Sequence, residues 1–176
     1  MKNQVVWVSY PRSCTKMRNR HIFALLVACS LLEVNGSVLE YQKMIKQVTG
    51  KGAILSYYGY GCYCGSKGKG EPKDATDWCC HIHNCCYKKL KESDCHGNTK
   101  RYDYAYKNGN IICALGSWCE EQVCACDRNA VFCLEKNLDT YNSRFVRYRD
   151  SKCTGSTPEC YRGCPSPCQS FNGAFN

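Results

Sequence analysis

Two stretches decide the fold: DATDWCCHIHNCCY at residues 74–87 and CACDRNAVFC at residues 124–133. Each contains two cysteines that lie seven residues apart, namely Cys79 with Cys86 and Cys126 with Cys133. On a helix, seven residues make about two turns, so each pair places two thiols on one face, roughly 10 Å apart. The spacing therefore predicts two helices that disulfides clamp face to face.

The spacing leaves the relative direction of these two helices open. Antiparallel helices would pair Cys79 with Cys133 and Cys86 with Cys126. Parallel helices would instead pair Cys79 with Cys126 and Cys86 with Cys133. Both arrangements use all four thiols, so the cysteines alone do not choose between them.

One histidine lies between the two cysteines of the first helix. His83 comes four residues after Cys79, so we expect its imidazole to face the second helix, where Asp127 follows Cys126. An aspartate there can accept the imidazole Nδ1 hydrogen and hold the tautomer, and such a pair could activate a water. The alternative is a structural buried hydrogen bond, and the cysteine spacing supports both interpretations equally.

The number of cysteines indicates the compartment and the domain boundaries. Eighteen cysteines in 176 residues are typical of a secreted disulfide scaffold and would not suit a reducing cytosol. We predict an N-terminal extension with a signal peptide at 1–36, one domain at 37–160 and a disordered tail at 161–176. Within 37–160 there are 14 cysteines, an even number that allows seven bridges.

The N-terminal segment carries the features of a signal peptide. The apolar run at 22–32 follows Lys16, Arg18 and Arg20 and precedes Val-Asn-Gly at 34–36. A membrane anchor is the alternative, but a spanning helix needs about 20 apolar residues and this run has 11. A start at Met17 would give a signal of conventional length. We therefore expect a secreted, extracellular protein.

The charge of the domain is only mildly basic. Residues 37–160 hold 18 basic and 14 acidic side chains, a net +4, whereas the whole chain has +9. This balance weakly favours an anionic partner such as a phospholipid surface, lipid aggregates or heparan sulfate, and a solvated surface would explain it equally well. We expect no nucleic-acid partner, and the sequence does not determine the oligomeric state.

The rest of the domain predicts short elements around the two clamped helices. Residues 37–50 indicate an amphipathic helix, because apolar residues recur at spacings of three and four: Val38, Tyr41, Ile45 and Val48. A glycine-rich loop follows at 58–70, and polar caps at 74–77 precede a helix at 79–90. The tyrosines at 102, 104 and 106 alternate before Gly109, which predicts a β-hairpin within 101–119, and a second long helix is expected at 122–141.

Four motifs resemble those of the secretory phospholipase A2 family: YGCYCG at 60–65, DATDWCC at 74–80, HNCCY at 83–87 and CACDRNAVFC at 124–133. The resemblance covers essentially all of 37–160. Cys153 and Cys160, within KCTGSTPEC, make the chain similar to the group II subtype, nearest to its IID and IIA branches. The implied fold is mainly α and disulfide-rich, with two long antiparallel clamped helices, an N-terminal helix, a calcium loop and a small β-hairpin.

The resemblance also implies a reaction and a role for each site residue. His83 would be the general base that draws a proton from water, which attacks the sn-2 ester of a glycerophospholipid, while Asp127 orients the ring. The hydroxyls of Tyr87 and Tyr102 would support Asp127. The cofactor would be Ca2+, which binds the substrate phosphate and stabilises the oxyanion with help from the Gly65 backbone N–H.

The expected calcium ligands depart from the family pattern. They are the backbone carbonyls of Tyr63, Gly65 and Lys67 and the side chain of Asn84, where the family has glycine at the third position and aspartate at the fourth. A neutral amide replaces a bidentate carboxylate, and an ammonium would repel the ion, so we expect weak calcium binding and weak hydrolysis. The alternatives are a catalytically inactive lipid- or receptor-binding homologue, or an unusual gene model of an ordinary active enzyme.

Overall fold

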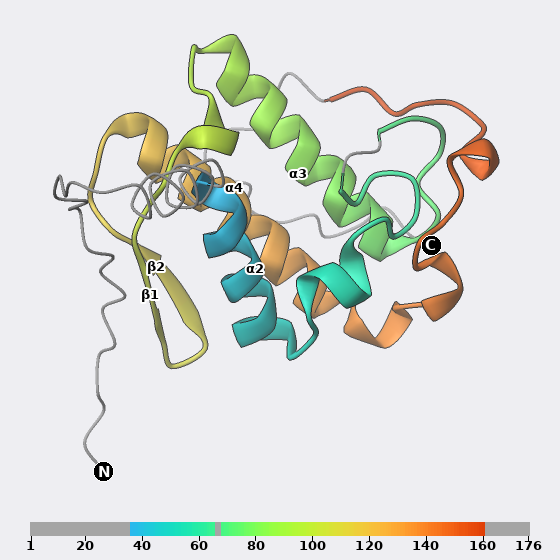
Figure 1. Cartoon of the computed structure of the whole chain (residues 1–176), viewed down its shortest axis with the longest axis horizontal. Coiled ribbons are helices and arrows are strands. Elements are labelled where there is room, and N and C mark those ends of the chain that lie inside the picture. Colours follow the sequence, from blue (N-terminus) through green and yellow to red (C-terminus); the bar gives the residue numbers. More distant parts are fainter. Residues whose placement is uncertain (1–35, 66–67, 161–176) are drawn as a thin grey trace, which may run out of the picture.

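The computed structural model describes residues 36–65 and 68–160 (Figure 1). Its long helices are α2 (Gly36–Thr49), α3 (Ala75–Glu92) and α4 (Trp118–Lys136). α3 and α4 pack against each other, and α2 packs on α4. Short helical turns follow α2, α3 and α4: η1 (Ala53–Tyr57), η2 (Gly97–Thr99), η3 (Leu138–Thr140), η4 (Ser143–Phe145) and η5 (Asp150–Lys152). The predicted class, mainly α and disulfide-rich, is confirmed.

Disulfides settle the direction of the two central helices. Cys79 pairs with Cys133 and Cys86 with Cys126, so α3 and α4 run antiparallel and the parallel alternative is wrong. The described residues contain five further bridges: Cys62–Cys153, Cys64–Cys80, Cys85–Cys160, Cys95–Cys119 and Cys113–Cys124. All 14 cysteines of 37–160 are therefore paired, as their even number predicted.

The buried face of α2 differs from the predicted apolar stripe. Val38 is 41% exposed, whereas Met44 is fully buried. The first turn is held by polar contacts that the apolar pattern does not show. Ser37 Oγ donates to the Gly97 carbonyl (3.0 Å), and a Cβ at Gly36 would lie 2.7 Å from the Lys100 carbonyl oxygen. Ser37 is therefore a buried residue of this turn, and its neighbour Val38 lies on the more exposed side.

Side-chain hydrogen bonds explain where α3 begins and where α4 begins and ends. α3 starts earlier than the expected residue 79 because the Asp74 side chain accepts from Asp77 N and caps it. α4 starts earlier than residue 122 because Ser117 and Glu120 form a capping box. α4 ends at Lys136, before the expected residue 141. The side-chain amide of Asn137, the next residue, donates to the Cys133 carbonyl (2.8 Å) and satisfies one of the last free carbonyls.

The predicted hairpin is present as β1 (Tyr104–Lys107) and β2 (Asn110–Cys113), a two-stranded antiparallel sheet. Lys107 pairs with Asn110, so the turn consists of Asn108 and Gly109. Both have positive φ, 50° and 77°, which is the conformation that a two-residue turn between twisted strands requires. Cys113 ties β2 to α4 through Cys124.

The remaining predictions on the organisation of the chain fall largely outside the described residues. The extension and signal peptide at 1–36 lie outside them except for Gly36, and so does the tail at 161–176. Within the described residues, no helix combines the length and the apolar character needed to cross a membrane.

Candidate functional site

The centre of the candidate site is the carboxylate of Asp127 on α4, which is fully buried. It accepts three hydrogen bonds: from His83 Nε2 (2.6 Å) and the Tyr87 hydroxyl (2.8 Å) on one oxygen, and from the Tyr102 hydroxyl (2.5 Å) on the other. A buried charge is costly unless donors surround it, and three donors do so here. The predicted meeting of His83 with Asp127 is therefore observed, and both tyrosines contact the same carboxylate.

The nitrogen of His83 that faces Asp127 is Nε2, so the expectation that Nδ1 would face it was wrong. The imidazole extends from α3 toward α4, and Nε2 lies farther from the His83 backbone than Nδ1 does. Nε2 is therefore the nitrogen that reaches the carboxylate. A carboxylate only accepts, so Nε2 carries the hydrogen of this bond. Nδ1 is then the nitrogen with a free lone pair, able to accept a proton.

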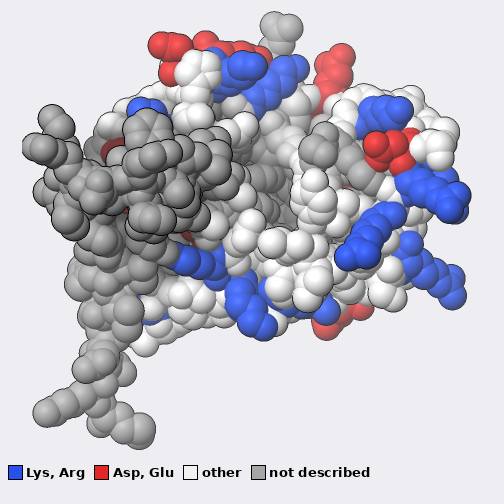
Figure 2. All heavy atoms as spheres, viewed as in Figure 1, with Lys and Arg blue, Asp and Glu red and all other residues white. Residues whose placement is uncertain are grey.

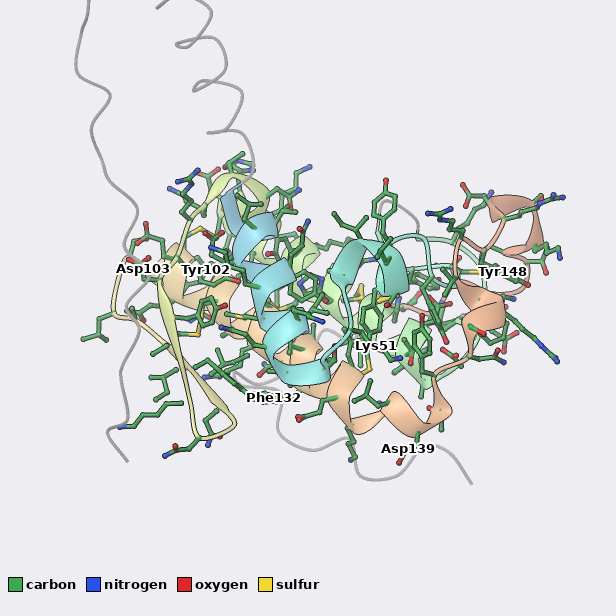
Figure 3. The ribbon with its side chains drawn as sticks, turned by 60° about the horizontal axis from the view of Figure 1, so that its bottom comes forward. Lys51, Tyr102, Asp103, Phe132, Asp139 and Tyr148 are labelled. Carbon is green, nitrogen blue, oxygen red and sulfur yellow. A yellow bond between two sulfur atoms is a disulfide. The ribbon has the colours of Figure 1, made fainter. Side chains whose placement is uncertain are left out.

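The two tyrosines remain hydrogen-bond donors over the ordinary pH range. Burial, followed by the negative charge of Asp127, raises the pKa of both Tyr87 and Tyr102 well above the usual phenol value. Tyr102 lies beside α2 (Figure 3), with its hydroxyl 3.8 Å from Met44 Sδ. The Tyr87 hydroxyl also lies 3.1 Å from Ser37 Oγ, so the start of α2 contacts the group that holds Asp127.

A second buried carboxylate, that of Asp77, holds the loop that precedes α3. Asp77 is fully buried and accepts from three backbone N–H groups, those of Cys62 (2.7 Å), Tyr63 (2.8 Å) and Lys73 (2.9 Å). The sequence suggested only a helix cap for Asp77. The signal that could have found its role is Gly61, because a Cβ there would lie 2.1 Å from Asp77 Cγ.

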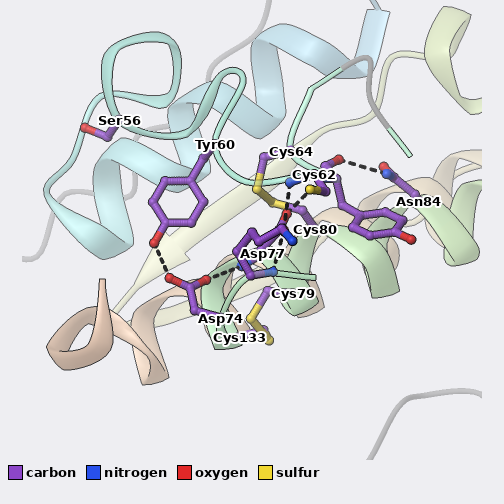
Figure 4. The surroundings of a disulfide bond; sticks show 12 residues. Ser56, Tyr60, Cys62, Cys64, Asp74, Asp77, Cys79, Cys80, Asn84 and Cys133 are labelled. Atoms are coloured by element: carbon purple, nitrogen blue, oxygen red, sulfur yellow. Dashed lines mark hydrogen bonds between the residues drawn. A yellow bond between two sulfur atoms is a disulfide. The ribbon is translucent and has the colours of Figure 1, made fainter. Parts of the chain in front are cut away.

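The side chain of Asn84 contacts this loop directly. Its Nδ2 donates to the Tyr63 carbonyl oxygen at 2.9 Å (Figure 4). The structure therefore brings together Asn84 and Tyr63, two of the four expected calcium ligands. Gly65 lies two residues further along the loop, in a left-handed conformation with φ of 93°. Lys67 lies outside the described residues.

A buried histidine, His81, packs against the same loop. His81 is 5% exposed, and its ring lies edge-on to the Tyr63 ring, with 4.7 Å between centroids. Burial lowers the pKa of His81, and the charge of Asp77 opposes that shift. The described part of the chain, this loop included, contains no group of three or more His, Cys, Asp and Glu side chains that could hold a metal ion.

The fold and the site define a small disulfide-clamped helical protein in which a buried aspartate holds a histidine between two antiparallel helices. Residues 38–146 match the family model described as Phospholipase A2. The chain belongs to the phospholipase A2 family, in its group II secretory branch. The predicted resemblance is thereby confirmed. Members of this family act at phospholipid surfaces and generally use calcium.

Several relatives match nearly their whole length. The group IID secretory phospholipase A2 of Homo sapiens is 51% identical over 137 residues, 77% of this chain and 94% of the relative. The group IID secretory phospholipase A2 of Mus musculus is 48% identical over 145 residues, 82% of this chain and 100% of the relative. The basic phospholipase A2 homolog Vur-S49 of Vipera renardi is 48% identical over 135 residues, 77% and 96% of the two chains.

Proposed function

We propose that this protein is a secreted phospholipase A2-type hydrolase that cleaves the sn-2 acyl ester of glycerophospholipids weakly, because its calcium binding is weakened. The proposal includes the boundaries inferred from the sequence: a signal peptide within 1–36, a functional domain at 37–160 and a tail at 161–176. The observation that carries it is the hydrogen bond from Asn84 Nδ2 to the Tyr63 carbonyl.

The hydrogen bonds around His83 support a role for this residue in proton transfer. With Nε2–H donated to Asp127, Nδ1 of His83 can take a proton from an attacking water. The imidazolium that forms is stabilised by the Asp127 charge, while Tyr87 and Tyr102 hold that carboxylate still. The Gly65 backbone N–H is the group that we expect to donate to the oxyanion.

The residues that would hold calcium fit the ion poorly. Ca2+ is bound by about six to eight oxygen ligands, and carboxylates largely set its affinity. Asn84 offers no carboxylate, and its Nδ2 places hydrogens against the Tyr63 carbonyl oxygen, one of the expected ligands. An N–H donor there already satisfies an oxygen that would otherwise face the cation. We infer that a metal ion would have to break this bond to bind.

Calorimetric titration with calcium, together with hydrolysis of anionic phospholipid vesicles, tests the proposal. The wild-type chain should bind calcium weakly and release fatty acid slowly. Asn84→Asp should bind calcium tightly and raise the rate roughly tenfold or more, because it restores a charged ligand. His83→Gln in either background is the inactive control. Wild-type calcium affinity and turnover equal to those of Asn84→Asp would refute weakened binding.

A second candidate is a non-catalytic lipid-binding homologue, favoured by a set of exposed apolar side chains. They lie on the first turn of α2 and on and beside η1, two elements that contact each other: Val38, Leu39, Ile54, Leu55 and Tyr58. Such a surface suits a phospholipid membrane. Vesicle binding without fatty acid release, in both the wild-type chain and Asn84→Asp, would select this candidate.

The charged surface is compatible with a further anionic partner. Segment 143–152 carries Arg144, Arg147, Arg149 and Lys152 against a single acidic residue, Asp150. In Figure 2 basic side chains gather at the right-hand end of the molecule, where Figure 1 shows the segment after α4. Heparan sulfate or an acidic receptor surface would complement these charges. Loss of heparin retention on charge reversal of this segment would support the assignment.

A further inference from the structure

We propose that Tyr41 is a positioning residue for His83: its ring, stacked on the imidazole, fixes the direction of Nδ1. This inference rests on the proposed hydrolase function of the site, because it concerns the histidine that would act as the base. It adds a residue of α2 to a site otherwise built from α3, α4, the loop before α3 and the chain before β1.

The stacking geometry carries the proposal. The rings of Tyr41 and His83 are nearly parallel, with 4.5 Å between centroids and 19° between planes. A second ring, that of Tyr87, lies 4.7 Å from the imidazole centroid at 58°. Tyr87 follows His83 by one helical turn on α3, whereas Tyr41 comes from a different helix. The imidazole is therefore packed against aromatic rings from two elements.

The hydrogen bond to Asp127 does not by itself fix the ring. Rotation about the Cβ–Cγ bond of a histidine is soft, because this sp³–sp² torsion has broad minima. Nδ1 lies farther from that axis than Nε2 does, so a rotation that barely disturbs the Nε2 hydrogen bond still moves Nδ1. A ring in van der Waals contact with one imidazole face blocks this rotation. Tyr41 therefore constrains the nitrogen that the Asp127 contact leaves least constrained.

The placement of α2 links the stack to the rest of the site. On the same side of the helix, Met44 is fully buried and its Sδ lies 3.8 Å from the Tyr102 hydroxyl. Tyr102 in turn holds Asp127. One face of α2 thus makes two contacts with the site. Tyr41 stacks on the imidazole of His83, and Met44 contacts Tyr102. Displacement of α2 would disturb both supports of His83 together.

The ring of Tyr41, rather than its hydroxyl, is the group that this role requires. Burial, followed by the nearby charge of Asp127, raises the pKa of Tyr41, so the phenol stays neutral and adds no charge to the site. A phenylalanine would present the same face to the imidazole. An aliphatic residue would fill part of the space without a flat surface. Tyr41→Phe and Tyr41→Leu therefore separate stacking from simple burial.

The test follows the His83 ring itself by proton NMR of the full-length secreted chain. In the wild-type chain the Nε2 hydrogen bonded to Asp127 should give a downfield resonance, and His83→Gln assigns it. Tyr41→Phe should retain this resonance, whereas Tyr41→Leu should broaden it or remove it through faster exchange with water. Tyr148→Leu, the same change at a tyrosine near the C-terminal end of the domain, should leave it unaltered. Should Tyr41→Leu not fold, Tyr41→Met is measured in its place.

Hydrolysis in the Asn84→Asp background gives the second readout. Tyr41→Leu should lower kcat by about tenfold to a hundredfold with little change in KM, since small misplacements of a reacting group have effects of this size. Tyr41→Phe should stay within about twofold of its parent. An unchanged resonance and an unchanged kcat in Tyr41→Leu would overturn the proposal. If Tyr41→Leu loses the resonance but the Asn84→Asp parent shows no hydrolysis, the positioning role of Tyr41 is supported and the proposed hydrolase function is refuted.

Discussion

At residue 84 an amide donates a hydrogen bond to a backbone oxygen, and we expect this contact to affect stability as well as activity. Asn84→Asp would face the Tyr63 carbonyl with a carboxylate that cannot donate. Without calcium we expect a loss of about 1 kcal/mol or more in the free energy of unfolding. With calcium the variant should be stabilised, whereas the wild-type chain, which binds the ion weakly, should respond much less. Thermal unfolding with calcium and with chelator measures both effects.

Asn98→Asp provides the matched control for that prediction, because it makes the same chemical change at an exposed position. It should show neither the loss with chelator nor the gain with calcium. An equal response to calcium in the wild-type chain and in Asn84→Asp would contradict the idea that the amide occupies a ligand of the ion.

The hydroxyl of Tyr102 stabilises a buried charge, so its removal should be costly. Tyr102→Phe leaves one oxygen of the fully buried Asp127 carboxylate without this donor. We expect a loss of about 1.5–3 kcal/mol, the range for hydrogen bonds to charged groups. Tyr104→Phe removes an exposed bond to Gln47 and should cost less than about 0.5 kcal/mol. Denaturant unfolding compares the two, and equal losses would argue against a special role for Tyr102.

The burial of His81 makes stability depend on pH. Its pKa in the folded chain lies below the ordinary value of 6.5, so between these two values the unfolded chain binds more protons. Stability should therefore fall as the pH decreases from about 6.5 through the folded pKa, and this contribution should level off below it. His81→Phe, which keeps a ring against Tyr63, should flatten the curve in this window. Unfolding free energies at several pH values would show an unchanged slope if another group were responsible.

The sequence predicted which residues meet at the site better than how they meet. The seven-residue cysteine spacing placed His83 opposite Asp127, because a helix fixes which side chains share a face. It could not predict that Nε2 would be the contacting nitrogen, since that depends on the distance between the helices. The stack of Tyr41 on His83 and the bond from Asn84 to Tyr63 join segments whose relative placement is set only by packing.

At the scale of elements, the end of each helix is decided by a few side-chain bonds. Ser117 caps α4 through Glu120 N (3.4 Å), while Glu120 accepts from Ser117 N (2.8 Å). Ser117→Ala should lower the free energy of unfolding by about 1 kcal/mol, and Ser117→Asp should retain most of it because aspartate also caps. Chemical denaturation checks the pair. Equal losses in both variants would mean that the capping box contributes little.

These caps also explain why helix existence was easier to predict than helix length. The seven-residue spacing of Cys126 and Cys133 predicts the middle of α4, where both cysteines share a face. The capping box at Ser117 adds a turn that the apolar pattern does not contain, and Asn137 ends the helix by its own bond to Cys133 O. The apolar pattern likewise did not predict that Ser37, which bonds to the Gly97 carbonyl, would be buried in the first turn of α2 while Val38 is exposed.

At the scale of the whole molecule, disulfides hold together a domain of limited core. The bridge between Cys62 and Cys153 joins residues 91 apart, and that between Cys85 and Cys160 joins residues 75 apart. Cross-links over such long loops remove much of the entropy of the unfolded chain, on the order of 4–5 kcal/mol each in the loop-closure account. The framework can therefore keep the site rigid while apolar side chains stay on the surface.

Those apolar side chains lead to a prediction for the whole molecule at a membrane. Leu55 on η1 is 74% exposed, and burying a leucine side chain in lipid is worth about 1.5–3 kcal/mol. Leu55→Glu should therefore weaken binding to anionic phospholipid vesicles about tenfold or more in the presence of chelator, where calcium plays no part. Leu115→Glu introduces the same charge at a residue that is 96% exposed beyond β2, and it should have little effect if η1 faces the lipid. Sedimentation with vesicles measures the binding of both variants. Equal losses of binding would mean that η1 is not the lipid contact, or that the added negative charge alone weakens binding.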